Sequence, residues 1–447
     1  MRKAKNWGRV WTMNINMNYF KRYLINLVLI WSMGCATLPV AHVGEGPLLG
    51  KVKEEETKIL AQVRQEIQLL EKKGAIYSDQ ALENYLNEVG RRVIPPERMA
   101  AEVTYRFRIV RDPTLNAFAC PTGDIFIHMG LLARLRTEGE LISILGHELS
   151  HVYQRDTLQR FLDAKQKTVA WKVTDLLLTP AFSVFGIGGI SEWGLVLVYA
   201  TSVTGYGREQ EARADIDGVK QMVAAGYDPY EGIHAMERFL EEEKKYRRGM
   251  EIFFLASHPN TRWRKAEIEK WLKSQNILPS SVPSENSIYR NITADLREEN
   301  ARVNLQMGRY YHALDDLDPI LKEGHESAKA VTLSGGAYRR MAEDTNVVKE
   351  ELSSKAWKEL ALKEKELKVQ WREKAQAAYH RALELDPQYP EAHLELGMLL
   401  VAEAKLPEAI GHLETYLVLS PEAKDRRFVT SQLQRLTKQK DKEGLSP

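Results

Sequence analysis

Apolar residues recur every three or four positions over most of this 447-residue chain, which predicts a mainly helical fold. The charged stretch 51–73 has helical character, and a second helix is predicted over 78–92 with one apolar face. Pro95-Pro96 ends this second helix, because proline lacks the backbone N–H that a helix needs.

The pattern then changes from helical spacing to alternation. Residues 103–110 alternate and are rich in β-branched and aromatic side chains, which predicts a strand, and 124–128 predict a second, shorter one. Helical spacing resumes over 129–136. An exposed edge of such a sheet can bind an extended peptide through backbone hydrogen bonds, with little side-chain selectivity.

Another amphipathic helix is predicted after Thr137. Thr137 and Glu140 have the spacing of a capping box, in which each side chain satisfies a free amide at the helix start. Apolar residues follow at helical spacing: Leu141, Ile144, Leu145, Leu149 and Val152. This helix carries the segment 146–151, Gly-His-Glu-Leu-Ser-His.

His147 and His151 lie four residues apart, so both rings share one face of the helix and can reach a single ion. Neutral imidazole is a good ligand for Zn²⁺, and Glu148 projects beside the same face, where a general base is needed. The alternative is a core helix with two spare histidines. That arrangement would leave buried imidazoles and a buried carboxylate in need of partners.

A catalytic zinc takes three protein ligands, and the candidate third ligand lies on a later helix. Glu211 and Asp215 are four residues apart, so one can bind metal while the other accepts a hydrogen bond from a ligand histidine. Gly218 and neighbouring alanines are small and would let this helix approach the first. The alternative for the acidic pair is a solvated helix face.

The N-terminal segment predicts export from the cytoplasm. Lys21-Arg22 precede an apolar run over 23–31 and then Cys35, the arrangement of a secretory signal peptide. It resembles a bacterial lipoprotein signal, in which Cys35 is lipidated, although Ser32 replaces the usual leucine. An uncleaved anchor helix is the alternative. The apolar segment 173–205 is interrupted by charged residues, proline and glycine, which favours a flap beside the site over a membrane span.

Composition excludes some functions. The 63 basic and 61 acidic residues nearly cancel to a net charge of +2, and no basic stripe points to nucleic acid. The chain has only two cysteines, so it has no disulfide framework, and Cys120 is predicted to be a packed core residue.

The C-terminal third contains a 34-residue repeat. Ala375, Tyr379, Ala382 and Pro387 recur as Ala409, Leu413, Tyr416 and Pro421. The period resembles tetratricopeptide repeats, helix pairs that stack to bury their apolar faces. A weaker copy runs over 308–317, and a charged helical insert is predicted around 343–374. The alternative is a generic helical tail.

Four motifs in order resemble the zinc metalloprotease family of HtpX and the CAAX prenyl proteases, and its periplasmic BepA-like and LoiP-like branch most closely. These are segments 116–126, the His-Glu-x-x-His segment 147–151, the Glu-x-x-Ala-Asp segment 211–215 and segment 257–264. The resemblance covers roughly residues 50 to 275.

The resemblance implies a role for each site residue. His147, His151 and Glu211 are the implied ligands of one Zn²⁺ per chain. Glu148 is the implied base and Asp215 a catalytic partner, which either orients a ligand or donates a proton. Two further residues match positions near the metal, where either could stabilise an oxyanion or the histidine could cap the zinc: His258 and Arg264.

The predicted fold class is therefore α+β, a mostly helical zinc protease domain with a small β-sheet followed by an all-α repeat domain. The expected boundaries are 1–35 for the lipoprotein signal, 36–280 for the protease and 281–440 for the repeats. The expected protein is a zinc metalloendopeptidase, lipid-anchored at the periplasmic face of the outer membrane. It would degrade misassembled envelope proteins, with the repeats recruiting substrate or outer-membrane assembly machinery. The rival hypothesis is a non-proteolytic scaffold or chaperone with a structural or latent zinc site.

Overall fold

The computed structural model describes residues 40–45, 48–99, 103–166, 206–246, 258, 260–280, 287–322 and 326–443. Within these ranges most residues are helical and one small sheet is present, so the predicted α+β class is confirmed. The predicted lipidation residue Cys35 and the apolar segment 173–205 lie outside the described residues. No helix in the described ranges is long and apolar enough to cross a bilayer.

The sheet has three short strands in the order β1-β3-β2, namely β1 (Arg106–Val110), β2 (Ala117–Ala119) and β3 (Asp124–His128). β1 is parallel to the central β3, and β2 is antiparallel to it with Phe118 opposite Phe126. Only two strands were predicted, and β1 begins three residues later than expected. β2 was missed because all three of its residues are buried, so it gives no alternation.

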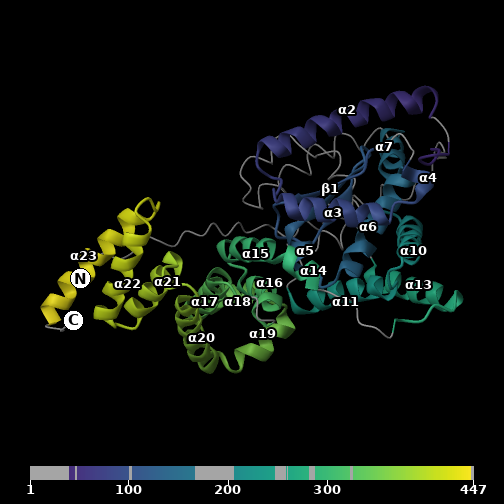
Figure 1. Ribbon diagram of the computed structural model, residues 1–447. Coiled ribbons are helices and arrows are strands. Elements are labelled where there is room, and N and C mark those ends of the chain that lie inside the picture. Colours follow the sequence, from purple (N-terminus) through teal and green to yellow (C-terminus); the bar gives the residue numbers. More distant parts are fainter. Residues whose placement is uncertain are drawn as a thin grey trace. The chain divides into compact units, whose positions relative to one another are not determined.

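Helices cover both faces of the sheet. α2 (Gly50–Lys72) packs on one face, where Ile59 and Val63 join the cluster that contains Phe118 and Phe126 (Figure 1). α3 (Gln80–Arg92) is N-capped by Asp79 and lies on the other face with α6. The short α4 (Pro96–Met99) follows.

The two outer edges of the sheet differ. Residues 75–77 run along β1, where Tyr77 N donates to Ile109 O at 2.9 Å and Arg111 N donates to Ala75 O at 2.8 Å. The outer edge of β2 has no partner strand among the described residues. β2 is therefore the edge that an added strand could use.

α5 (Met129–Arg134) follows β3 directly, and α6 (Glu138–Tyr153) begins after a three-residue break. Thr137 is the N-cap of α6, and its Oγ1 accepts a hydrogen bond from Glu140 N at 2.9 Å. The predicted capping box is only half formed. The Glu140 carboxylate accepts from Arg136 N at 2.6 Å, one residue before the cap.

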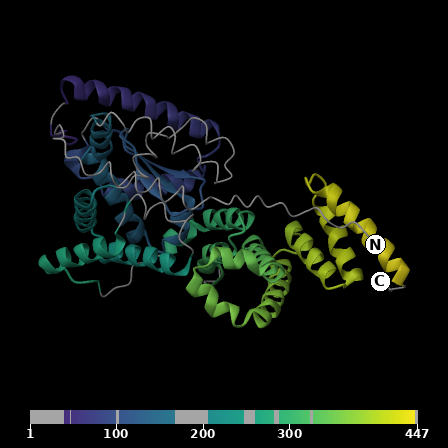
Figure 2. The same cartoon turned by 180° about the vertical axis from the view of Figure 1, so that it is seen from behind.

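The remaining helices of this part surround α6. They are α7 (Asp156–Gln166), α10 (Arg208–Ala224), α11 (Tyr230–Lys245) and α13 (Thr261–Ser274). α10 and α11 both contact α6, and α13 packs against α10 and α11 (Figures 1 and 2). α10 ends before Gly226, whose φ of 81° suits glycine.

The C-terminal region is helical throughout its described residues. Its helices are α14 (Ser287–Ile292), α15 (Ala294–Gln306), α16 (Tyr310–Lys322), α17 (Ala328–Glu343), α18 (Thr345–Glu351), α19 (Ser354–Ala361), α20 (Glu364–Leu385), α21 (Pro390–Ala402), α22 (Leu406–Leu419) and α23 (Arg426–Glu443). Neighbouring pairs contact each other, including α15 with α16, α17 with α20 and α21 with α22. Equivalent positions of the 34-residue repeat are buried: Ala375 and Ala409, Tyr379 and Leu413, Ala382 and Tyr416.

The start of this region is fixed to α5 by buried polar contacts. Arg297 of α15 donates to the carbonyl oxygens of Ala133 and Leu135, the latter at 2.7 Å, at the C-terminal end of α5. Tyr289 OH donates to Leu132 O at 2.7 Å. These donors satisfy helix-end carbonyls that have no partner within α5.

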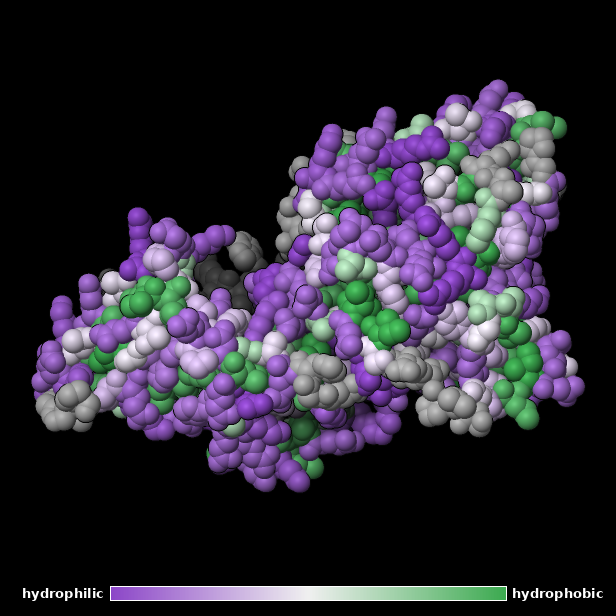
Figure 3. Space-filling model, viewed as in Figure 1, coloured by the Kyte–Doolittle hydropathy of each residue, from purple (hydrophilic) through white to green (hydrophobic). Residues whose placement is uncertain are grey.

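The surface drawn in Figure 3 is mostly hydrophilic, with separate apolar spots. The exposed large apolar residues are spread along the described chain, for example Leu49, Leu278, Leu362, Val418 and Phe428. Such scattered side chains are normal on protein surfaces. The predicted core residue Cys120 is buried and unbridged, and burial raises the pKa of its thiol well above the usual value.

Candidate metal centre

Close packing of α6 and α10 brings the motif residues together. Gly146 faces Gly218, and a Cβ on Gly146 would lie 2.9 Å from Gly218 Cα. A Cβ on Gly218 would lie 3.0 Å from the backbone nitrogen of His147. Two helices can approach this closely only where side chains are absent, so the predicted role of Gly218 is confirmed.

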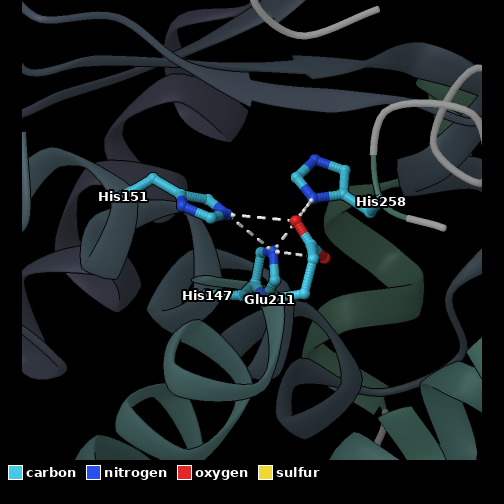
Figure 4. Close-up of side chains that lie close together, drawn as sticks. All are labelled: His147, His151, Glu211 and His258. Carbon is cyan, nitrogen blue, oxygen red and sulfur yellow. Dashed lines mark hydrogen bonds and ion pairs between the residues drawn. The ribbon is translucent and has the colours of Figure 1, made fainter. Parts of the chain in front are cut away.

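Four buried side chains converge on one point: His147, His151, Glu211 and His258 (Figure 4). Nε2 of His147 lies 3.1 Å from Nε2 of His151 and 3.1 Å from Nδ1 of His258. Glu211 Oε1 lies 3.0 Å from His258 Nδ1 and 3.6 Å from His151 Nε2. The ligand atoms of all four lie within 4.8 Å of one another.

The facing histidine nitrogens indicate a cation between them. Nδ1 of His147 contacts the carboxylate of Asp215 at 2.9 Å, and Nδ1 of His151 contacts that of Asp156 at 2.8 Å. A carboxylate only accepts, so each Nδ1 carries a proton, and in the neutral form that binds a metal each ring presents an Nε2 lone pair to the other. Two lone pairs 3.1 Å apart repel unless a proton or a metal ion lies between them.

The donor set fits a zinc-like ion. Nitrogen ligands at about 2.0–2.1 Å from one tetrahedral ion lie roughly 3.3 Å apart, close to the 3.1 Å seen here. Imidazole and carboxylate are both common ligands of such ions. The centre is therefore compatible with a bound metal ion.

The surroundings shift the pKa values of the two histidines in opposite directions. Burial and the guanidinium of Arg264 lower the pKa of His147, which keeps that ring neutral. Burial also acts to lower the pKa of His151, but the carboxylates of Asp156 and Glu211 outweigh it and raise the pKa to about 9. A proton can therefore hold the place that a metal ion would take, and metal binding would release it.

Asp156 was missed by the sequence analysis. Besides His151, it accepts from Gln210 Nε2 at 2.9 Å and from Arg213 at 2.7 and 2.8 Å. It follows Arg155, whose φ of 51° turns the chain back toward α6. Asp156 lies beyond the end of α6. Helical spacing predicts contacts only within a helix, so it could not predict that Asp156 contacts His151.

Arg264, on α13, binds the acidic residues of α10. It donates to Asp215 Oδ1 at 2.6 Å and to Oδ2 at 2.8 Å, and it pairs with Glu211 Oε2 at 3.1 Å. Burial favours the protonated form of Asp215, but the Arg264 charge outweighs this and lowers the pKa of Asp215. Asp215 is therefore ionised, which favours the predicted orienting role over proton donation.

His258 is held beside these residues from two sides. Its backbone oxygen accepts from Arg264 Nη1 at 3.2 Å, and its Nε2 lies 3.4 Å from Glu148 Oε1. His258 is fully buried. The predicted accessory residues His258 and Arg264 are therefore both brought to the centre.

Glu148 lies at the same centre but is bound differently. Its carboxylate is fully buried, and neither oxygen accepts a hydrogen bond from any described residue. A buried carboxylate without hydrogen-bond partners destabilises the fold, which points to a role in chemistry.

Tyr206 is a second residue that the sequence analysis missed. Its ring stacks on His151 with centroids 3.7 Å apart and an angle of 15° between the planes. Its hydroxyl lies 3.3 Å from Thr157 Oγ1. The stacked ring restricts the plane of the His151 imidazole. The sequence pattern around Tyr206 gives no indication of this contact.

Comparison with known proteins agrees with this geometry. Residues 80–272, which contain all the site residues, match peptidase family M48. The chain is 28% identical over 195 residues to the mitochondrial metalloendopeptidase OMA1 of Schizosaccharomyces pombe, covering 43% of this chain and 54% of that protein.

Bacterial relatives share a similar level of sequence identity with the chain. Identity to the beta-barrel assembly-enhancing protease of Escherichia coli K12 is 25% over 252 residues, covering 52% of this chain and 50% of that protein. Identity to the protein of the same name from Yersinia pestis is 30% over 168 residues, covering 37% of this chain and 33% of that protein. The chain thus spans about half the length, or less, of the relatives it matches. The resemblance found in the motifs is confirmed, since residues 80–272 match peptidase family M48.

Proposed function

We propose that this chain is a zinc-dependent endopeptidase of the bacterial cell envelope, acting on misfolded or misassembled outer-membrane and periplasmic proteins. The observation that carries the proposal is the buried ligand cluster with the unsatisfied Glu148 carboxylate beside it. The relatives' names, metalloendopeptidase and beta-barrel assembly-enhancing protease, support the reaction type and the location.

In this proposal His147, His151 and Glu211 hold the zinc. Bound zinc supplies a Lewis acid that polarises the scissile carbonyl. Asp215 and Asp156 orient the two histidines through their Nδ1 protons. Arg264 keeps Glu211 and Asp215 in place and is a positioning residue, because its guanidinium is buried against both carboxylates.

Glu148 is the proposed general base. It accepts a proton from the attacking water and later returns it to the leaving amine. A carboxylate that is already hydrogen-bonded would be less able to do this, and Glu148 accepts no such bond from the described chain. The outer edge of β2, which has no partner strand among the described residues, supports binding of the peptide in an extended form.

His258 is proposed to close the site in a resting state. Its Nδ1 lies at ligand distance from its neighbours, so it can complete a four-ligand set. A catalytic zinc needs one position free of protein. We therefore propose that His258 leaves when a substrate binds.

The test is the Glu148→Gln variant, with Glu209→Gln on the exposed side of α10 as the matched control. Cleavage of an unfolded protein should fall by roughly 10²–10⁴-fold in Glu148→Gln and stay unchanged in the control. Both variants should bind one zinc. Wild-type cleavage by Glu148→Gln would refute the mechanism.

A second candidate is a non-proteolytic repeat scaffold or chaperone with a structural zinc. The observation in its favour is the fourth protein ligand, since structural zinc sites are closed. His258→Ala separates the two. The peptidase proposal expects zinc to be retained and cleavage to rise, whereas a structural site should lose zinc affinity and stability without any cleavage.

The location and the partners belong to the same proposal. We propose that residues 1–35 are a lipoprotein signal, that Cys35 is lipidated, and that domains 36–280 and 281–440 are the protease and the repeats. The repeats would recruit substrates or outer-membrane assembly machinery. Fatty-acid labelling that is lost in Cys35→Ser would support the anchor, and a chain that carbonate cannot extract despite Cys35→Ser would contradict it.

A further inference from the structure

A cavity of about 90 Å³ lies beside the metal centre. Its walls come from α2, from the end of β2 and the turn that follows, and from the C-terminal half of α6. The lining residues that matter here are Lys53, Glu56, Arg64, Cys120, His151 and Arg155.

The cavity continues the catalytic face of α6. Glu148, His151 and Val152 are spaced i, i+3 and i+4, so they share one side of α6, and Arg155 follows just beyond the end of this helix. His151 belongs both to the metal centre and to the cavity wall. The space therefore lies one helical turn from the proposed base.

The C-terminal end of the edge strand β2 also borders the cavity. Ala119, the last residue of β2, and the next three residues line the cavity. A peptide paired with the outer edge of β2 would extend past this end of the strand. The side chain of a residue close to the scissile bond would then face the cavity.

The volume limits what can enter. A cavity of about 150 Å³ holds a benzene molecule, so about 90 Å³ is too small for an aromatic side chain. A side chain with the size of aspartate or glutamate is small enough.

Among side chains small enough to enter, the charge of the lining residues favours acidic ones. Three cations line the space, Lys53, Arg64 and Arg155, against one carboxylate, Glu56. Glu56 is shared by Lys53 at 3.0 Å and Arg155 at 3.2 Å. No carboxylate among the described residues pairs with Arg64, which leaves an excess of positive charge at the cavity.

We propose that this cavity is a specificity pocket for an acidic side chain, aspartate or glutamate, next to the scissile bond. The proposal rests on the proposed endopeptidase function. Arg64 is the residue that discriminates, because it is exposed and can turn to a bound carboxylate. Glu56 and Arg155 build the wall, and Arg155 also donates to Ala41 O at 2.7 Å.

The test measures peptide binding by the zinc-loaded, full-length Glu148→Gln protein. The probes are unstructured peptides in which a single glutamate or a single glutamine is scanned through every position. Arg64→Glu is introduced into the same protein, and Lys58→Glu is its matched control. Lys58 lies on the same helix, undergoes the same charge change, and is exposed and absent from the cavity wall.

At one position, glutamate should bind about tenfold more tightly than glutamine. Arg64→Glu should abolish or invert this ratio, while Lys58→Glu should leave it unchanged. A ratio within about twofold at every position, or a preference that survives Arg64→Glu, overturns the pocket. Absence of peptide binding overturns it too.

Cleavage by the wild type is measured in parallel, so that the two proposals can fail separately. An Arg64-dependent glutamate preference without cleavage refutes the endopeptidase and leaves the pocket standing. Cleavage with no acidic preference refutes only the pocket.

Discussion

His147 and His151 donate their Nδ1 protons to different carboxylates, Asp215 on α10 and Asp156 at the start of α7. Each ring is therefore oriented from a separate element. A carboxylate behind a ligand histidine fixes its tautomer and raises its basicity. The metal centre thus depends on residues that do not touch the ion.

Replacing Asp156 tests this dependence. In Asp156→Asn the zinc affinity should fall about 10–100-fold, because the amide can present its NH₂ group to His151 and no longer favours the ligand tautomer. The measurement is competition with a chromophoric chelator. Asp163 lies on the same helix and accepts a hydrogen bond from Gln159, away from the ligand histidines, so Asp163→Asn should bind zinc as the wild type does. Equal affinity in both variants would contradict the assigned role.

Asp112 predicts how stability depends on pH. Burial acts to raise its pKa, but His128 and Thr114 outweigh this and lower the pKa from 3.8 to about 2. Because the pKa of Asp112 is lower in the folded state, the ionised carboxylate stabilises the fold above about pH 4. This stabilisation is lost as the pH falls toward 2. It is worth on the order of 2 kcal/mol. Urea unfolding should show that the free energy of unfolding falls less between pH 7 and pH 3 in Asp112→Asn than in the wild type. An equal fall in the two proteins would contradict the assignment.

At the scale of elements, the contact between α6 and α10 decides whether the centre forms. The two helices meet at Gly146 and Gly218 without intervening side chains. This contact sets the distance from the α6 histidines to Glu211. A change of one methyl group should therefore be felt in both stability and metal binding.

Gly146→Ala places a Cβ 2.9 Å from Gly218 Cα, where backbone must move. Its free energy of unfolding should fall by about 1–3 kcal/mol, and zinc affinity should fall with it. Gly411→Ala is the matched control, since a Cβ there meets nothing within 4 Å in the middle of α22. It should stabilise the protein by roughly 0.5–1 kcal/mol. Similar unfolding curves for the two variants would contradict the account of this contact.

The sequence could predict what helical periodicity encodes. His147 and His151 follow from i, i+4 spacing, and so do Glu211 and Asp215, because each pair shares a regular helix. β2 has three buried residues and no alternation, so its pattern carries no strand signal. Asp156 reaches His151 only through the left-handed turn at Arg155, and Tyr206 only through tertiary packing. Periodicity cannot report such contacts.

At the scale of the whole chain, the predicted boundary at 280/281 separates residues that are tightly joined. Arg297 and Tyr289 cap the end of α5, and Arg134 of α5 pairs with Glu242 of α11 at 2.8 Å and Asp315 of α16 at 3.6 Å. Sequence composition marks where a repeat pattern begins. It does not show which repeat helices pack against the preceding domain.

Arg297→Ala tests this connection. It leaves the buried Ala133 and Leu135 carbonyls without their donors, so the free energy of unfolding should fall by about 2–4 kcal/mol. Arg302→Ala, on the same helix and half exposed, breaks only an i,i+3 pair with Glu299 and should cost less than about 1 kcal/mol. Denaturant titration of both variants measures the two losses in the free energy of unfolding. Equal losses would mean that the contact of Arg297 with the end of α5 contributes no more to stability than a surface ion pair.

The central claim is that one zinc, held by the cluster of His147, His151 and Glu211, is required for peptide-bond cleavage. The most direct measurement removes the metal with a chelator and follows cleavage of an unfolded protein as Zn²⁺ is added back. The account predicts that cleavage disappears with the metal and returns in full at one equivalent. Cleavage that persists in metal-free protein, or that never appears in zinc-loaded protein, would contradict it.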